Sequence, residues 1–225
     1  MTMRQRESFS TYTGIIIFVN VIAFLLFFVL ARNLGFERVI SLIALQPSSF
    51  LERPWTILTS MFMHSPSGLS HIFVNMISLM FLGGFVEKLI GKKRFLWLYL
   101  GSGLLAGLFF VVLSRLFGVI PLGEILIGSP TTIAVRASGA IFGLGGLLAV
   151  LTPRLPVLVF FILPMPMWIA MVFLMGVLWA LSLSLGLPIG NTAHLGGLLV
   201  GLGYGFYLKR KYPHKTKMIS KYFSR

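Results

Sequence analysis

Two glycine-rich stretches, ASGAIFG at residues 137–143 and AHLGGLLVG at residues 193–201, decide the fold of this chain. Each places one polar side chain, Ser138 or His194, near the beginning of an apolar segment. Small residues recur in both segments at four-residue spacing: Gly139 and Gly143, then Gly197, Gly201 and Gly205. This spacing lets the backbones of two membrane helices approach closely. We therefore expect the two helices to pair and their serine and histidine to meet.

The composition is that of an integral membrane protein. Of the 225 residues, 57% are hydrophobic, and the mean hydropathy is +0.94, whereas soluble domains contain about 45–50% apolar residues. The expected fold is an all-α bundle of six transmembrane helices with an interfacial loop between the first two helices. The six apolar segments cover residues 14–31, 69–86, 95–116, 133–151, 166–187 and 191–208. The residues between 152 and 165 are broken by prolines and predict an interfacial turn.

The distribution of positive charge predicts the orientation. The net charge is +14, but the basic residues cluster beside the apolar segments as topology signals do, so we expect no nucleic-acid partner. With both termini inside, 14 of the 19 Lys and Arg residues lie on the cytoplasmic side. We thus expect a multi-pass protein of the cell membrane, with cytoplasmic residues 1–13, a membrane domain at 14–208 and a basic cytoplasmic tail at 209–225. Anionic-lipid binding is an alternative role for the tail.

Four polar residues are expected at one depth in the membrane. At a rise of about 1.5 Å per residue, His71, Asn75, Ser138 and His194 lie about 20–26 Å above the cytoplasmic ends of their helices. A polar side chain at that depth is costly unless it finds a partner or a water-filled cavity. The shared level therefore predicts one polar pocket in the outer third of the bilayer.

A serine and a histidine in such a pocket suggest nucleophilic catalysis. Serine is a weak nucleophile until a base takes its proton, and His194 can serve as that base. The chain has no Asp, and none of its five Glu residues is expected nearby, so the sequence offers a dyad without a carboxylate. Phe142, one turn after Ser138, can instead hold the imidazole by ring packing.

The remaining polar residues suggest an oxyanion site and exclude other protease classes. His71 and Asn75 are four residues apart and leave one helix face, where both can donate hydrogen bonds to an oxyanion. His64, in the first loop, is expected to be structural or solvated. A thiolate or aspartyl mechanism is excluded because Cys and Asp are absent. No HExxH motif is present, so we expect neither a metal nor another cofactor.

Taken in order, these motifs resemble those of the rhomboid intramembrane serine proteases. The similar stretches are HIFVN (71–75), ASGAIFG (137–143) and AHLGGLLVG (193–201), with PWTILTSMFMH (54–64), GGFVE (83–87) and RFLWLYL (94–100) as weaker support. The resemblance runs from about residue 54 to 205. Each motif alone is weak, and their order and spacing together carry the similarity.

The resemblance implies a six-helix bundle with a cavity open to the outside, and substrates that are transmembrane helices of other proteins. It implies Ser138 as nucleophile and His194 as general base, with an oxyanion hole formed by His71, Asn75 and the Ser138 backbone N–H. It further implies a Glu87–Arg94 pair near the cytoplasmic face. The fifth helix would be a lateral gate for substrate, with Trp168, Phe173 and Trp179.

Two departures from the family pattern keep a second interpretation open. Arg136 stands two residues before the serine, where the family has glycine, and Phe142 stands where many relatives carry tyrosine. A rhomboid-like pseudoprotease that binds transmembrane helices without cutting them is therefore the alternative. A transporter ranks last, since ion-coupled transport commonly needs carboxylates at mid-membrane and none is expected there. The sequence leaves the oligomeric state open.

Overall fold

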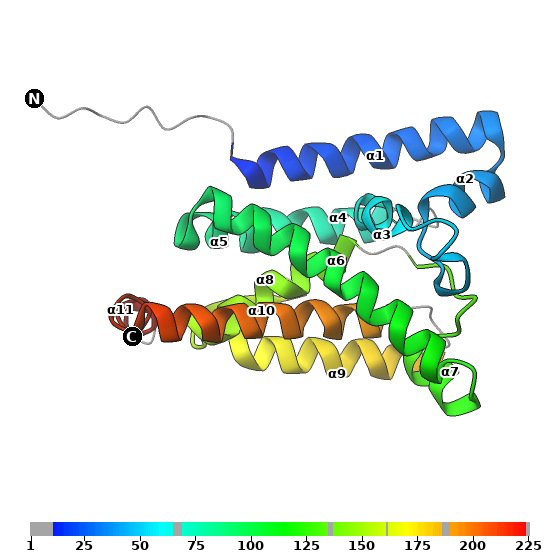
Figure 1. The fold of residues 1–225 in the computed structure, drawn as a ribbon. Helices are drawn as coiled ribbons and strands as arrows, with labels where there is room; N and C mark the ends of the chain where they lie inside the picture. The colour runs from blue at the N-terminus through cyan, green and yellow to red at the C-terminus, as the bar shows by residue number, and fades with distance from the viewer. Residues whose placement is uncertain (1–10, 65–68, 135–136, 161, 186–189, 224–225) are drawn as a thin grey trace, which may run out of the picture.

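The computed structural model describes residues 11–64, 69–134, 137–160, 162–185 and 190–223. Each of the six apolar segments contains a helix among its described residues, and these helices run along one another (Figure 1). They form α1 (Tyr12–Leu34), α4 (Leu69–Ser78) continued by η3 (Leu79–Gly83) and α5 (Gly84–Ile90), α6 (Lys92–Phe117), α8 (Ala137–Leu151), α9 (Met167–Leu185) and α10 (Asn191–Lys211). Four spans among the described residues are long and apolar enough to cross a membrane: Tyr12–Leu34, Leu69–Ile90, Lys92–Phe117 and Met167–Ser184. The all-α membrane fold is thus confirmed, and the count of six crossings stays a prediction.

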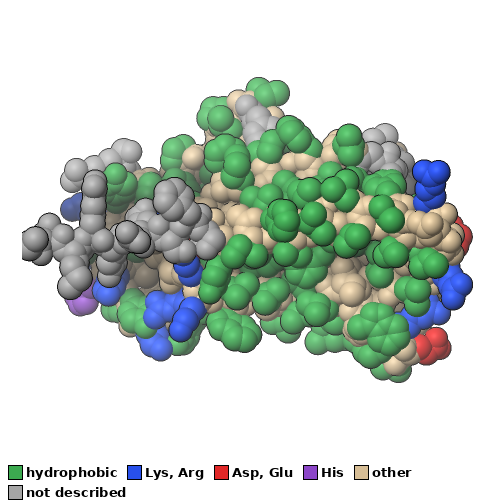
Figure 2. Space-filling view, turned by 90° about the horizontal axis from the view of Figure 1, so that it is seen from above, with side chains coloured by type: hydrophobic (Ala, Val, Ile, Leu, Met, Phe, Trp, Pro, Cys, Tyr) green, Lys and Arg blue, Asp and Glu red, His purple; other side chains and the backbone are tan. Residues whose placement is uncertain are grey.

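The surface has the polarity that a bilayer requires. Hydrophobic side chains cover the middle of the visible face, Lys and Arg side chains lie toward both of its ends, and acidic side chains are visible at one end (Figure 2). Large apolar side chains are widely exposed on the helices, including Phe18, Phe73 and Val172. An apolar belt between polar ends is stable in lipid and would be costly in water.

The centre of the bundle is α8, which packs against α6 on one side and α10 on another (Figure 1). Thirteen of its fifteen residues are buried. Its residues are small or aliphatic almost throughout, so neighbouring helices can surround it without leaving a polar group unpaired. This central position fixes the element that carries Ser138.

The predicted Glu87–Arg94 pair is wrong. The Glu87 carboxylate accepts hydrogen bonds from the backbone N–H groups of Tyr12 (2.9 Å) and Thr13 (2.8 Å) and from the Thr13 hydroxyl (2.7 Å). It thereby satisfies free donors at the beginning of α1, where the helix dipole favours negative charge. Arg94 instead donates to the Tyr212 hydroxyl (3.1 Å) and lies 5.3 Å from the centre of that ring.

The first loop is largely structured. It contains α2 (Phe36–Ile43), η1 (Pro47–Ser49), α3 (Thr56–Thr59) and η2 (Ser60–Phe62), and α7 (Pro121–Ile127) lies at the same end of the bundle (Figure 1). Two arginines hold this loop through backbone carbonyls. Arg115 donates to Pro47 (2.8 Å) and Ser48 (3.0 Å), and Arg53 donates to Ser41 (2.6 Å). These arginines on the predicted outer side therefore have local structural partners.

Two segments are more ordered than the sequence predicts. The expected turn before the fifth helix contains an antiparallel hairpin of β1 (Pro156–Val159) and β2 (Leu163–Pro166). Its prolines are tolerated because both strands are edges, where a missing N–H costs little. The basic tail forms a further helix, α11 (Pro213–Tyr222), which runs across the end of the bundle (Figure 1).

Candidate active site

The structure brings Ser138 and His194 together. Ser138 is the second residue of α8, and its Oγ lies 2.6 Å from Nε2 of His194, the fourth residue of α10. The serine is half-buried, whereas the histidine is only 7% exposed. The hydrogen bond joins residues 56 positions apart, so it depends on the packing of the two helices.

That packing rests on the glycines that the sequence predicts. A Cβ atom at Gly197 would overlap the carbonyl oxygen of Gly139, and one at Gly201 would overlap the carbonyl oxygen of Gly143. The two backbones therefore touch directly, with no side chain between them. Such close approach is available only to glycine. It holds the beginnings of α8 and α10 at the separation that a Ser–His hydrogen bond needs.

Phe142 supports the imidazole from one side. The two ring centroids lie 4.5 Å apart with an angle of 17° between the ring planes, so the rings are stacked. This is the contact that the one-turn spacing from Ser138 predicts. Glu87 is committed to the beginning of α1, which faces the opposite end of the bundle. The His194 ring is thus held against an aromatic ring.

His71 and Asn75 lie on α4, which packs against α8. Asn75 is 6% exposed, and its Nδ2 donates to the backbone carbonyl of His71 at 2.9 Å. An amide carries two N–H donors, so one remains for a further acceptor. The His71 ring is half-buried. Two polar groups on one helix face, next to the helix of Ser138, have the composition expected of an oxyanion site.

His64 lies next to this helix face, and the sequence did not predict its burial there. It is 1% exposed, and its ring centroid lies 5.5 Å from that of His71. The interpretation as a solvated residue is wrong, and the structural one fits. Burial lowers the pKa of His64 to about 4, and the nearby His71 ring lowers it in the same direction. His64 is consequently neutral at pH 7. Its sequence signal was an apolar context, in the stretch MFMH.

A short outer helix ties the bundle together near the site. The Trp179 indole N–H of α9 donates to the Leu126 carbonyl of α7 (3.1 Å), and the Thr192 hydroxyl of α10 donates to the Ile127 carbonyl (2.9 Å). The last carbonyls of a helix lack partners within it, so α7 offers natural acceptors. Both α9 and α10 are thereby anchored to the same element.

Two further expectations concern Arg136 and metal binding. Arg136, which replaces the family's glycine, lies outside the described residues. Within the described part of the chain, no three His, Cys, Asp or Glu residues lie close enough together to hold a metal ion.

Comparison with known proteins agrees with this arrangement. A family model, the Rhomboid domain, matches residues 51–211. RHOMBOID-like protein 2 of Arabidopsis thaliana is 36% identical over 156 residues, which are 68% of this chain and 42% of that protein. Rhomboid protease GluP of Bacillus subtilis is 28% identical over 196 residues, which are 85% of this chain and 33% of that protein. The chain belongs to the rhomboid family.

The relatives differ in activity by their names. Inactive RHOMBOID-like protein 8 of Arabidopsis thaliana is 43% identical over 61 residues, which are 27% of this chain and 17% of that protein. The chain spans about two-fifths or less of the length of these relatives. Family membership thus establishes a multi-pass membrane protein of the rhomboid type and leaves catalysis to be argued from the site.

Proposed function

We propose that this protein is an intramembrane serine endopeptidase that cleaves transmembrane segments of other membrane proteins with a Ser138–His194 dyad. The observation that carries the proposal is the 2.6 Å hydrogen bond between Ser138 Oγ and His194 Nε2. A nucleophile within hydrogen-bond reach of its base is the arrangement that nucleophilic catalysis requires. The same family contains relatives named as proteases.

The dyad accounts for both halves of peptide hydrolysis. Ser138 Oγ attacks the peptide carbonyl carbon while its proton passes to His194 Nε2. The C–N bond then breaks, and Nε2 gives that proton to the leaving amine. Water attacks the acyl-enzyme ester, its proton passes through Nε2 to Ser138 Oγ, and the acid product leaves. Stacking on Phe142 keeps Nε2 directed at the serine through these steps.

The negative charge of the tetrahedral intermediate needs hydrogen-bond donors, and three groups support the proposal as candidates for them. We assign this role to His71, to the free amide hydrogen of Asn75 and to the Ser138 backbone N–H in the first turn of α8. The first N–H groups of a helix have no acceptor within it. Donors fixed before the reaction stabilise an oxyanion strongly.

The depth of the dyad points to the substrate class. His194 lies 15 residues before Lys209, so it sits about 22 Å along α10 from the basic end. With both termini cytoplasmic in the cell membrane, this level falls in the outer leaflet. A helical backbone hides its carbonyls, so the scissile segment must be extended there. Small or helix-breaking residues near the cleaved bond are the expected preference, as in the family.

Cleavage in liposomes tests the proposal. The purified chain is reconstituted with a single-span substrate, and the product termini are identified by mass spectrometry. Ser138→Ala is expected to abolish cleavage, and His194→Ala to lower its rate at least ~10²-fold, because the serine loses its base. Both variants should keep the melting temperature of the native chain. Undiminished cleavage by either variant contradicts the dyad.

The alternative is a pseudoprotease that binds transmembrane helices without cutting them. The inactive relative and the Arg136 substitution favour it. Under this alternative the native chain and Ser138→Ala both capture a transmembrane substrate and neither releases product. Arg136→Gly separates the two readings further, since it should restore cleavage only if the arginine is what blocks an otherwise complete dyad.

A further inference from the structure

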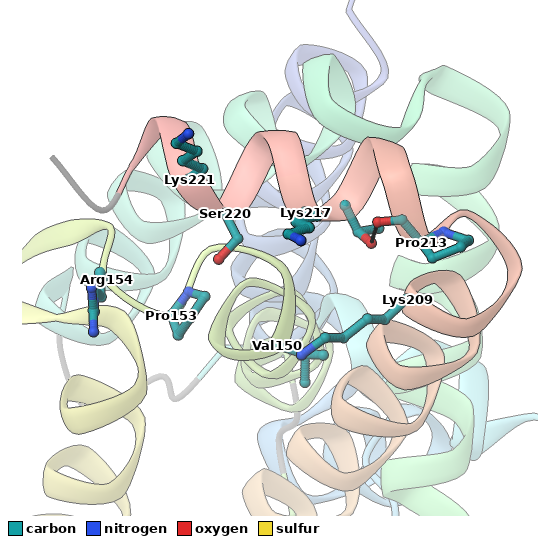
Figure 3. A pocket seen from close by; sticks show the side chains of 9 residues that line it. Val150, Pro153, Arg154, Lys209, Pro213, Lys217, Ser220 and Lys221 are labelled. Carbon is teal, nitrogen blue, oxygen red and sulfur yellow. Dashed lines mark hydrogen bonds between the residues drawn. The ribbon is translucent and has the colours of Figure 1, made fainter.

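A second site lies at the opposite end of the bundle from Ser138. A pocket of about 720 Å³ opens where α11 crosses the ends of α8 and α10. It is lined by Val150, Pro153, Arg154, Lys209, Pro213, Thr216, Lys217, Ser220 and Lys221 (Figure 3). Its volume is within the range of about 300–1,000 Å³ typical of small-molecule sites. The residues come from three separate elements, so the folded chain alone creates this pocket.

The lining is strongly basic. Four cations surround the pocket, Arg154 from the turn after α8, Lys209 from α10, and Lys217 and Lys221 from α11. None of the described residues that line it is acidic. The Ser220 hydroxyl points toward the turn that carries Pro153 and Arg154, and Lys209 extends beneath α11 (Figure 3). Arg154, Lys209 and Lys217 are like charges around one hollow and repel one another, and a bound anion would remove that cost.

The α11 helix packs against the end of the bundle, where the ring of Phe223, directly after α11, meets that of Phe85 in an edge-to-face contact with 5.3 Å between the ring centroids. Thr216 is 6% exposed, and its hydroxyl bonds back to the carbonyls of Tyr212 (3.0 Å) and Pro213 (3.1 Å). Met218 and Tyr222 are instead 73% and 75% exposed. A helix that is basic on one side and carries exposed apolar side chains elsewhere is typical of the membrane interface. The pocket therefore opens at the level of lipid headgroups.

We propose that this pocket binds a phosphate group, and that its source is the headgroup of an anionic phospholipid in the cytoplasmic leaflet. A guanidinium binds phosphate through paired N–H groups, and lysines add point charges. A hydroxyl donor such as Ser220 completes such a site. The cytoplasmic leaflet is the anionic one, and it attracts basic segments beside membrane helices. The site is distinct from the dyad and carries no role in cleavage here.

Cations at this place also favour the C-terminal ends of α8 and α10 through the helix dipole. The experiment must therefore measure binding separately from stability. Lys209→Gln/Lys217→Gln removes two charges from the pocket. Arg210→Gln/Lys215→Gln is the matched control, because it removes two exposed charges from the same helices, α10 and α11, that do not line the pocket.

Binding is measured on the full chain in neutral detergent, where no extended anionic surface exists. Phosphatidylglycerol, phosphatidylcholine and inorganic phosphate are each titrated, and bound molecules are counted by native mass spectrometry. The native chain is expected to retain phosphatidylglycerol. The pocket variant should bind it at least ~10-fold more weakly, because each lost cation removes a charge-assisted hydrogen bond. The control should stay within about twofold of the native chain, since distant exposed charges are screened.

Three other results would bear on the proposed site. Equal losses in both variants, or equal retention of phosphatidylcholine, overturn the site. In the third, inorganic phosphate binds the native chain at millimolar concentration and fails to bind the pocket variant, while both proteins retain lipid equally. That result supports a phosphate site but overturns the lipid headgroup as its source. Melting temperatures that match across all three proteins show that the changes in binding do not come from unfolding.

Discussion

The two helices that follow α8 in the chain, α9 and α10, contact it in different ways. Against α10, the backbones meet directly, with Gly197 on the Gly139 carbonyl. Against α9, Gly145 meets the thioether ends of Met171 and Met167. Only 22% of the residues in the apolar span of α9 are buried, whereas the beginning of α10 is buried from Asn191 to His194.

This difference separates two tasks that an intramembrane protease must combine. A backbone-to-backbone contact has no soft side chain to absorb movement, so it fixes the distance from Ser138 to His194. Methionine is flexible and adapts to displacement, so α9 can shift at low cost. Under the proposed function, the chemistry would depend on the rigid contact, and α9, the gate that the family resemblance implies, would be the more adaptable neighbour.

The largest effect is expected from one methyl group added at the rigid contact between α8 and α10. In Gly197→Ala the new Cβ overlaps the Gly139 carbonyl oxygen, so α8 and α10 must separate. We expect a loss of ~1–3 kcal/mol in the free energy of unfolding, and a cleavage rate lower by ~10²-fold because the dyad is displaced.

The matched control is Gly203→Ala on the same helix, where a Cβ meets no atom within 4 Å. It should keep the native rate, and it should stabilise the chain by up to ~1 kcal/mol through helix propensity. Thermal unfolding in detergent and liposome cleavage check both. Equal behaviour of the two variants would show that the contact is not rigid.

A second prediction concerns the His64 side of the site and follows from its pKa. The folded state holds this pKa at about 4, below the ordinary value of 6.5, so the unfolded state binds the proton more readily. The contribution of neutral His64 to the free energy of unfolding is therefore complete above about pH 6.5 and is lost as the pH falls toward 4. Between pH 7 and 5 the loss amounts to about 2 kcal/mol.

Parallel unfolding curves at pH 7 and 5 measure this loss. His64→Gln, which does not titrate, should show a clearly smaller change between the two pH values than the native chain. If the variant and the native chain lose the same stability, buried neutral His64 is not the source. The activity of His64→Gln at pH 7 also tests whether this residue supports His71.

The third prediction concerns the stacked ring. Phe142→Leu keeps an apolar side chain but removes the ring contact with His194, which is worth about 0.5–1.5 kcal/mol. We expect kcat to fall by ~3–10-fold with little change in KM, because substrate binding does not use this ring. Phe142→Tyr retains the ring and should retain the rate. A loss confined to KM would indicate that Phe142 contacts the substrate.

The smallest effect is expected at α9. Trp179→Phe removes the hydrogen bond between the indole N–H and the Leu126 carbonyl, which is worth about 1 kcal/mol. If α9 is a lateral gate, cleavage of a transmembrane substrate should rise by up to ~5-fold. Cleavage of a short soluble peptide is the control and should not change. A lower rate with the transmembrane substrate would contradict the gate.

The sequence predicted the parts of the site that follow from local spacing and depth. Helical periodicity placed Phe142 one turn from Ser138, and four-residue glycine spacing predicted the pairing of α8 with α10. Both contacts are present. The depth argument holds because a serine or histidine inside a membrane is costly unless it has a polar partner or contact with water.

The errors concern partners that only the three-dimensional arrangement determines. Glu87 and Arg94 are close in sequence, and opposite charges suggest a pair. The Glu87 carboxylate instead accepts hydrogen bonds from the first N–H groups of α1, which are more than 70 residues away in the sequence. His64 lies in a loop, and its apolar local context does not name the partners that bury it, which are Phe24 of α1 and His71 of α4. Long-range partners of this kind leave no periodic signal.

The most direct test of the central claim is whether Ser138 reacts as an activated nucleophile. The folded native chain is treated with a fluorophosphonate, and the adduct is located by mass spectrometry of peptides. We expect one adduct in the native chain, on Ser138 Oγ, formed with loss of fluoride. We expect none in His194→Ala, because that variant lacks the base that activates the serine. A folded native chain that stays unlabelled, or equal labelling in His194→Ala, would contradict the dyad.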